Sequence, residues 1–253
     1  MPNKATDNFL KGLRGLSGTV LLLCGAQATR GHCRAEAKLL VSPSSVRTSV
    51  AALRAGAESR RQIYLYDTDD VDLLSHGVIL RLRTGTRGDL TLKLRWDNRN
   101  PRQPGESVES MKCEVDVVGS AALSSYSLGR RWKHESIPRT GEALYAALSG
   151  AQRRMLATAG TAIDWHRVKR IVQVRAMEWQ ARGKRPLNAV SVEFWEWPSG
   201  KVLELSAKAD NPKSGQSTLD LLRQMALGGG LIIEKDQEAK TSIVLHAVTT
   251  AAR

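Results

Sequence analysis

A hairpin of leucines that alternate with cations constrains the fold of this chain most. Segments 80–83 and 90–95 alternate leucine with arginine, lysine or threonine, and a glycine-containing turn separates them. Because successive side chains of a strand point to opposite faces, one face of the hairpin is apolar and the other is cationic. The cations are Arg81, Arg83, Lys93 and Arg95. Like charges on neighbouring strands repel each other, so this face must be either solvated or matched by an anion.

The overall charge indicates which partners suit such a face. Among 253 residues, 38 lysines and arginines exceed 25 acidic residues, which gives a formal charge of +13. This excess favours polyanions, namely nucleic acid, polyphosphate, nucleotides or an anionic membrane surface, and does not choose among them. Aromatic residues make up only 5% of the chain, which disfavours single-stranded nucleic acid because that class of site needs stacking platforms. A basic nucleic-acid-binding barrel is therefore possible but less favoured.

The N-terminal segment has the form of a targeting signal. Three cations in the first 14 residues precede a short apolar run, 16–24, and residues 26–28 have the small–x–small form of a cleavage site. The run is too short for a stable transmembrane span. We expect residues 1–28 to be a signal peptide and 29–253 to form one domain, periplasmic or secreted after cleavage near Ala28. The alternative is an ordinary first helix of a cytoplasmic protein.

Two cysteines, Cys33 and Cys113, would remain after such a cleavage. In an oxidising compartment they could pair as one disulfide, and two buried unpaired thiols are the alternative. The spacing of cysteines and histidines matches no zinc site.

Hydrophobic patterns along the chain predict many strands and a few helices. We expect helices over 46–55, 70–75, 140–159 and 216–227, a loop over 97–107, and a helix or strand over 236–248. The expected strands cover 33–41, 62–66, 80–83, 90–95, 111–118, 168–179, 190–197 and 201–207. An open antiparallel sheet would leave their charged faces in water, whereas a closed barrel would turn them inward. The enclosed cations and carboxylates would suit a phosphate chain with a divalent metal.

Four segments carry a recognisable combination of motifs. Block 66–83 is the most specific and reads Tyr-Asp-Thr-x-Asp-x-Asp-Leu-Leu-x-x-Gly-x-x-Leu-Arg-x-Arg. The weaker segments are Arg34-Ala35-Glu36-Ala37-Lys38, then Leu92-Lys93 with Glu114 and Asp116, and finally Glu193 with Glu204-Leu205-Ser206. Over residues 33–245 this combination resembles the CYTH, or triphosphate tunnel metalloenzyme, superfamily.

The resemblance implies an α+β fold, an eight-stranded antiparallel β-tunnel, closed as a barrel with a charged lumen and helices packed outside. It also implies metal-dependent hydrolysis of a triphosphate-bearing substrate: inorganic triphosphate, short polyphosphate or a nucleoside triphosphate. The alternative is a non-catalytic polyphosphate- or nucleotide-binding protein on the same fold. An adenylate cyclase, another activity of the family, would need base recognition that the sequence does not reveal.

The resemblance further implies roles for the matching residues. The phosphate oxygens would be bound by Lys38, Arg81, Arg83, Lys93 and Arg175. The metal, Mg²⁺ or Mn²⁺, would be held directly or through water by Glu36, Glu114, Asp116 and Glu204. Catalysis would depend on Lys38 and on Glu204, which would orient the attacking water, and Lys240 would be a further basic contact.

Two positions depart from the family pattern. Arg34 and Ser206 stand where the resemblance would place glutamates. A cation held by fewer carboxylates binds more weakly, and a nearby guanidinium repels it. Phosphate binding should tolerate these changes better than catalysis, which is why the binding protein is kept as the alternative.

Overall fold

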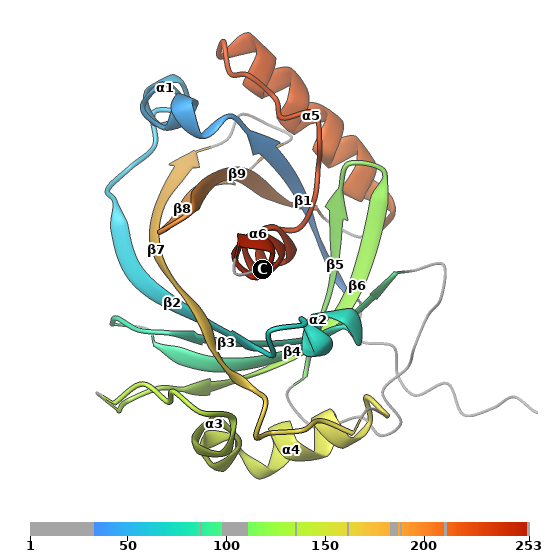
Figure 1. Cartoon of the computed structure of the whole chain (residues 1–253). Coiled ribbons are helices and arrows are strands. Elements are labelled where there is room, and N and C mark those ends of the chain that lie inside the picture. Colours follow the sequence, from blue (N-terminus) through green and yellow to red (C-terminus); the bar gives the residue numbers. More distant parts are fainter. Residues whose placement is uncertain are drawn as a thin grey trace, which may run out of the picture. The chain divides into compact units, whose positions relative to one another are not determined.

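The alternating segments close into a barrel in a computed structural model of the chain (Figure 1). The structure describes residues 33–86, 88–97, 111–134, 136–160, 162–182, 187, 189–209 and 212–251. The expected signal peptide and residues 98–107 of the expected loop lie outside these residues. Within the described part of the chain, no helix combines the length and the apolar character that crossing a membrane requires.

Nine strands of the described residues form the barrel. They are β1 (Arg34–Val41), β2 (Ser59–Asp67), β3 (Val78–Arg83), β4 (Asp89–Asp97), β5 (Lys112–Val118), β6 (Ala121–Arg131), β7 (Lys169–Arg182), β8 (Ala189–Trp197) and β9 (Gly200–Ala209). Their order is β1-β5-β6-β4-β3-β2-β7-β8-β9, and β9 pairs back onto β1. Neighbours are antiparallel except β1 and β5, which run parallel with Arg34 opposite Glu114.

The closed α+β barrel is confirmed, but the expectation of eight antiparallel strands is wrong in two respects. Strand β6 was not expected, because its sequence contains three serines and alternates clearly only around Tyr126 and Leu128. The parallel β1–β5 pair could not be read from the pattern either, because side chains alternate in the same way in parallel and antiparallel strands.

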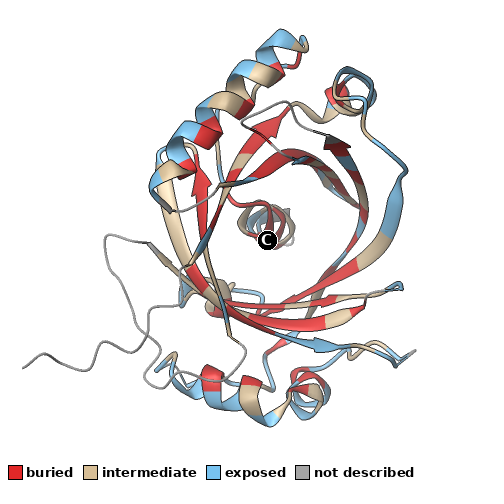
Figure 2. Cartoon of the chain, turned by 180° about the vertical axis from the view of Figure 1, so that it is seen from behind, coloured by how far each residue is buried: buried red, intermediate tan, exposed pale blue. Residues whose placement is uncertain are grey.

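Helices cover the apolar outer faces of the barrel, as expected. The leucines of β3 and β4 pack with α3 (Gly141–Ala147) and α4 (Gly150–Ala157), whereas α5 (Gly215–Gly228) covers β1, β5 and β9. The single helix expected over 140–159 is divided, because the Ser149 hydroxyl and the Gln152 side chain form a capping box that starts α4. Figure 2 shows buried residues along the barrel wall and exposed residues on the outer sides of the helices.

The C-terminal helix α6 (Lys240–Ala251) occupies a different place. Seen along the barrel in Figure 1, it lies within the ring of strands. Its Val244 and Leu245 pack with apolar side chains on the inner face, among them Leu65, Val174 and Trp195. One end of the barrel is therefore filled by apolar contacts, and the ambiguity over segment 236–248 is resolved as a helix.

A buried carboxylate and a glycine position the start of β3. The Asp67 side chain is fully buried and accepts backbone N–H bonds from Thr68, Leu73 and Leu74, which anchors the short helix α2 (Asp72–Ser75). Gly77 follows with φ +73°, and a Cβ built there would lie 2.1 Å from the backbone oxygen of Arg95. Strands β3 and β4 can therefore approach closely only if residue 77 has no side chain.

A disulfide joins the beginnings of β1 and β5. Cys33 and Cys113 are bonded, with a sequence separation of 80 residues and Cα atoms 4.6 Å apart. Of the alternatives left open by the sequence, the structure has the paired cysteines. The bond links two strands that are distant in sequence and pair in parallel, next to the charged ends of both.

Replacing Gly77 by alanine should destabilise the fold. The positive φ costs a side chain about 1–2 kcal/mol and the contact with the Arg95 oxygen adds to this, so we expect a loss of more than about 2 kcal/mol in urea unfolding. Gly228→Ala is the control, because nothing lies within 4 Å of its Cβ position. Equal effects of the two substitutions would contradict the argument.

Removing the disulfide should lower the free energy of unfolding by about 2–4 kcal/mol, because the bond restricts the unfolded chain. Urea unfolding of the oxidised protein, the reduced protein and Cys33→Ser/Cys113→Ser would measure this. An unfolding midpoint that a reductant leaves unchanged would show that the bond contributes nothing.

Candidate functional site

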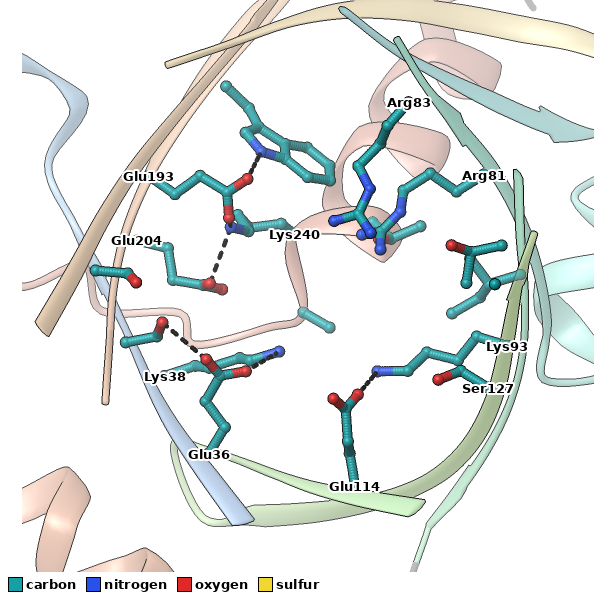
Figure 3. Close-up of a pocket in the computed structure, with 18 of the residues that line it drawn as sticks. Glu36, Lys38, Arg81, Arg83, Lys93, Glu114, Ser127, Glu193, Glu204 and Lys240 are labelled. Atoms are coloured by element: carbon teal, nitrogen blue, oxygen red, sulfur yellow. Dashed lines mark hydrogen bonds and ion pairs between the residues drawn. The ribbon is translucent and has the colours of Figure 1, made fainter. Parts of the chain in front are cut away.

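The charged inner faces of the strands enclose a cavity of about 310 Å³, which we call the lumen site (Figure 3). Its lining includes Glu36 and Lys38 from β1, Arg81 and Arg83 from β3, Lys93 and Arg95 from β4, Glu114 from β5, Glu193 from β8, Glu204 from β9 and Lys240 from α6. Figure 3 shows the labelled side chains pointing toward a common space from opposite walls. Cations outnumber carboxylates among the described lining residues, so the site favours an anion.

Asp116, just behind the lining, holds three of these cations in place. Its side chain is 1% exposed and lies 2.9 Å from Lys38 Nζ, 3.3 Å from Lys93 Nζ and 3.7 Å from an Arg95 nitrogen. Burial acts to raise the pKa of Asp116, but the neighbouring lysines outweigh it and hold the pKa well below its usual range. Asp116 therefore remains ionised and anchors cations from β1 and β4.

The two arginines of β3 differ in how their charge is balanced. Arg83 makes a two-pronged bond to Asp89, at 2.6 and 2.8 Å, and Thr91 donates to the same carboxylate. The Arg81 Nε has no hydrogen-bond partner among the described residues. Burial and the adjacent Arg83 lower the pKa of Arg81 to about 10. Among the described residues Arg81 thus has no ion-pair partner, and Asp89 and Glu193 favour its charge only from farther away.

A second charged group lies beside α6. Glu193 and Glu204 are directly opposite each other on β8 and β9, and Lys240 contacts both carboxylates, with Nζ 2.9 Å from Glu204 Oε1. Burial acts to raise the pKa of Glu193, but Lys240 outweighs it and lowers the value to about 2. For Glu204, which is 4% exposed, burial dominates and raises the pKa despite Lys240 and Lys38.

Most of the site residues expected from the sequence meet in or beside the lumen. Those that line it are Glu36, Lys38, Arg81, Arg83, Lys93, Glu114 and Glu204. Ser206, at a position where the resemblance would place glutamate, donates a hydrogen bond of 3.1 Å to Glu36. Arg34 is exposed at the beginning of β1.

Arg175 does not belong to the site. Its side chain is 68% exposed on the outer face of β7 and pairs with Glu196 at 2.6 Å. The inner face of β7 instead presents Val172, Val174 and Ala176, because α6 packs against it. The charged parity of this strand therefore faces water, and the expectation that Arg175 binds phosphate has no support in its position.

The site residues expected from the sequence leave out three cations that line the lumen, namely Arg61, Arg95 and Lys112. The alternation placed Arg95 on the cationic face beside Lys93, but no binding role was assigned to it. Arg61 lies on β2 and is ion-paired with Glu178 of β7. It follows a run of polar residues in which no alternation is visible, so nothing in the sequence indicates its direction.

The four carboxylates expected to hold a metal do not fit that role as arranged here. Asp116 is surrounded by three cations, Glu36 pairs with Lys38, Glu114 pairs with Lys93, and Glu204 pairs with Lys240. Among the described residues, no three acidic, histidine or cysteine side chains gather as a metal site would require. Each of these carboxylates contacts an ammonium or guanidinium group, so none of them is a free ligand for a metal in this arrangement.

A second cavity of about 660 Å³ lies beside α2 and α6. It shares Ile79, Arg95 and Ala239 with the lumen site and is also lined by Trp96 and His246. The two cavities are therefore neighbours, and this one has a more apolar lining.

Comparison with known proteins supports the fold. No protein-family model and no curated protein matches the sequence. A structure from Hippeastrum, described as a proposed adenylyl cyclase with a dominant triphosphatase activity, is 18% identical, with a TM-score of 0.55 over 82% of this chain and 93% of that one. A proposed adenylate cyclase from Bacillus halodurans is 15% identical, with a TM-score of 0.56 over 83% of this chain and 96% of that one. The chain thus shares the closed-barrel fold of these two structures.

Proposed function

We propose that the lumen site binds the triphosphate group of a small substrate, or a short polyphosphate. The observation that supports this most is Arg81, a cation inside the barrel whose Nε finds no partner in the part of the chain that the structure describes, and whose neighbour is another arginine. An unneutralised cation next to a like charge destabilises the fold. A phosphate chain would supply the missing charge and the missing acceptors, because guanidinium groups bind phosphate oxygens in a fixed fork.

The enclosure of these cations argues for a small anion. Lys38, Lys93 and Arg95 have side chains that are 17%, 15% and 13% exposed, so they do not form a solvated sheet face. A nucleic-acid duplex is read by cations on an open surface or groove, whereas these line the inside of a barrel. The position of the site therefore favours a triphosphate or short polyphosphate over a nucleic acid.

We propose hydrolysis of a phosphoanhydride bond as the reaction, favoured by Glu204. Burial raises the pKa of this carboxylate, and it lies near Lys38 in the lumen. A carboxylate with a raised pKa is a better acceptor for the proton of an attacking water at neutral pH. Water would attack the terminal phosphorus, the bond to the bridging oxygen would break, and the lumen cations would neutralise the leaving phosphate. The Hippeastrum protein, described as having dominant triphosphatase activity, supports this reaction by analogy of fold.

We also propose that the protein works in an oxidising compartment, after export. The disulfide supports this, since such bonds persist mainly in secreted, periplasmic or lumenal proteins.

Arg81→Met should abolish binding of tripolyphosphate and stabilise the free protein. We expect tripolyphosphate at 100 times its Kd to stabilise the parent by about 2.7 kcal/mol and this variant not at all, and the free variant to gain about 1 kcal/mol from losing an unpaired cation. Thermal melts in EDTA would measure both effects. Arg175→Met is the matched control, because it removes an equal charge from the outer face. Equal losses in both variants would show non-specific attraction instead of a lumen site.

Glu204→Gln should lower phosphate release from tripolyphosphate and ATP by about 10²–10⁴-fold, the usual contribution of a general base, and leave the stabilisation by tripolyphosphate. Glu196→Gln, on the outer face, should change neither. Parallel assays with Mg²⁺, Mn²⁺ and EDTA test the metal requirement expected from the sequence. No release by the parent under any condition, with binding retained, would leave the non-catalytic binding protein.

A further inference from the structure

Lys240 enters the lumen from a helix, not from a strand, and its position is locally unfavourable. It is the first residue of α6, and its side chain is only 8% exposed. The N-terminus of a helix carries a partial positive charge, so a buried ammonium there is repelled by its own helix. Something else must compensate for this placement.

The two carboxylates that Lys240 contacts are unfavourably placed without it. Glu193 and Glu204 are directly opposite each other across the β8–β9 pair, and both line the lumen. Like charges at opposite positions on paired strands are destabilising, and burial increases the effect. Two facing carboxylates inside a protein are also a natural pair of ligands for a hard divalent cation.

Lys240 satisfies both carboxylates, and an aromatic side chain completes its surroundings. Its Nζ contacts Glu193 and lies 2.9 Å from Glu204 Oε1. It also lies 4.9 Å from the centre of the Trp195 ring, and the Trp195 indole N–H donates a bond of 2.8 Å to Glu193. Figure 3 shows the ammonium between the two labelled glutamates. The buried ammonium of Lys240 and the two facing carboxylates of Glu193 and Glu204, each unfavourable alone, therefore stabilise one another.

We propose that the Lys240 ammonium is a built-in cation that occupies the place of a divalent metal between Glu193 and Glu204. The partial positive charge of the α6 N-terminus adds to the ammonium and opposes entry of a second cation. At this wall of the lumen, the positive charge that faces a bound anion consequently comes from side chains and not from a metal ion. This inference does not depend on the anion or on the reaction, because metal ions alone test it.

The test is a titration of the protein with MnCl₂ or MgCl₂ at constant ionic strength, read as the melting temperature. We expect no saturable rise for the parent and a saturable rise of about 5 °C for Lys240→Met, which exposes the carboxylate pair to the metal. Lys240→Arg keeps the charge and should behave like the parent. Lys240→Met/Glu204→Gln should lose the response, which assigns the new site to this pair.

Two results would overturn the proposal. One is a saturable Mn²⁺ response of the parent that Glu204→Gln removes, and the other is a folded Lys240→Met that does not respond to either metal. If Lys240→Met does not fold, the Mn²⁺ electron paramagnetic resonance signal decides. Bound Mn²⁺ in the parent that is lost in Glu204→Gln contradicts the built-in cation, whereas no difference between the two proteins supports it.

Discussion

The interior of this barrel depends on charges that are enclosed and therefore must be compensated. Asp116 is the clearest case, since one buried carboxylate contacts Lys38, Lys93 and Arg95 from two strands. Without it, these cations would repel one another in a space of low dielectric constant. The same requirement gives Arg83 its bond to Asp89 and Lys240 its two carboxylates. Arg81 is a buried lumen cation without an ion pair among the described residues, and this is the basis of the proposed phosphate site.

The barrel divides into a charged part and an apolar part along its length. Alongside the body of α6, the inner wall presents aliphatic and aromatic side chains that pack with Val244 and Leu245. Past the N-terminus of α6, the inner wall is polar and lines the lumen site. This division explains why the described residues of β7 contribute no cation to the site, since most of its inner face packs with α6 and the lumen is lined from β7 by Glu178. It also places Lys240 at the boundary, where the helix begins and the carboxylates are within reach.

Much of the site could be predicted because β4 and parts of β1, β3 and β9 alternate between polar or charged residues and apolar residues. On such strands one decision, that the apolar face packs against helices, directs every charged side chain inward. Arg175 was misassigned because charged residues occur at both odd and even positions of β7, so the sequence does not show which set faces the lumen. The packing of α6 against Val172, Val174 and Ala176 decides that Arg175 faces outward. Strand β6 was missed because serine and glycine line its inner face, and small polar residues do not distinguish a strand from a loop.

The sequence by itself determined which side chains share a face of each strand, because period-two alternation is a local pattern. The closed barrel and the cations of its lumen were predicted from the resemblance that block 66–83 carries. It did not determine the partners of the carboxylates. Glu204 reads equally well as a metal ligand or as one member of an ion pair, and the choice depends on whether a cation from another segment reaches it. The fold brings Lys240 from 36 residues later in the chain to within 2.9 Å of that carboxylate. Only the tertiary structure decides this, because the interaction joins a helix terminus to two strands and leaves no periodic pattern in the sequence.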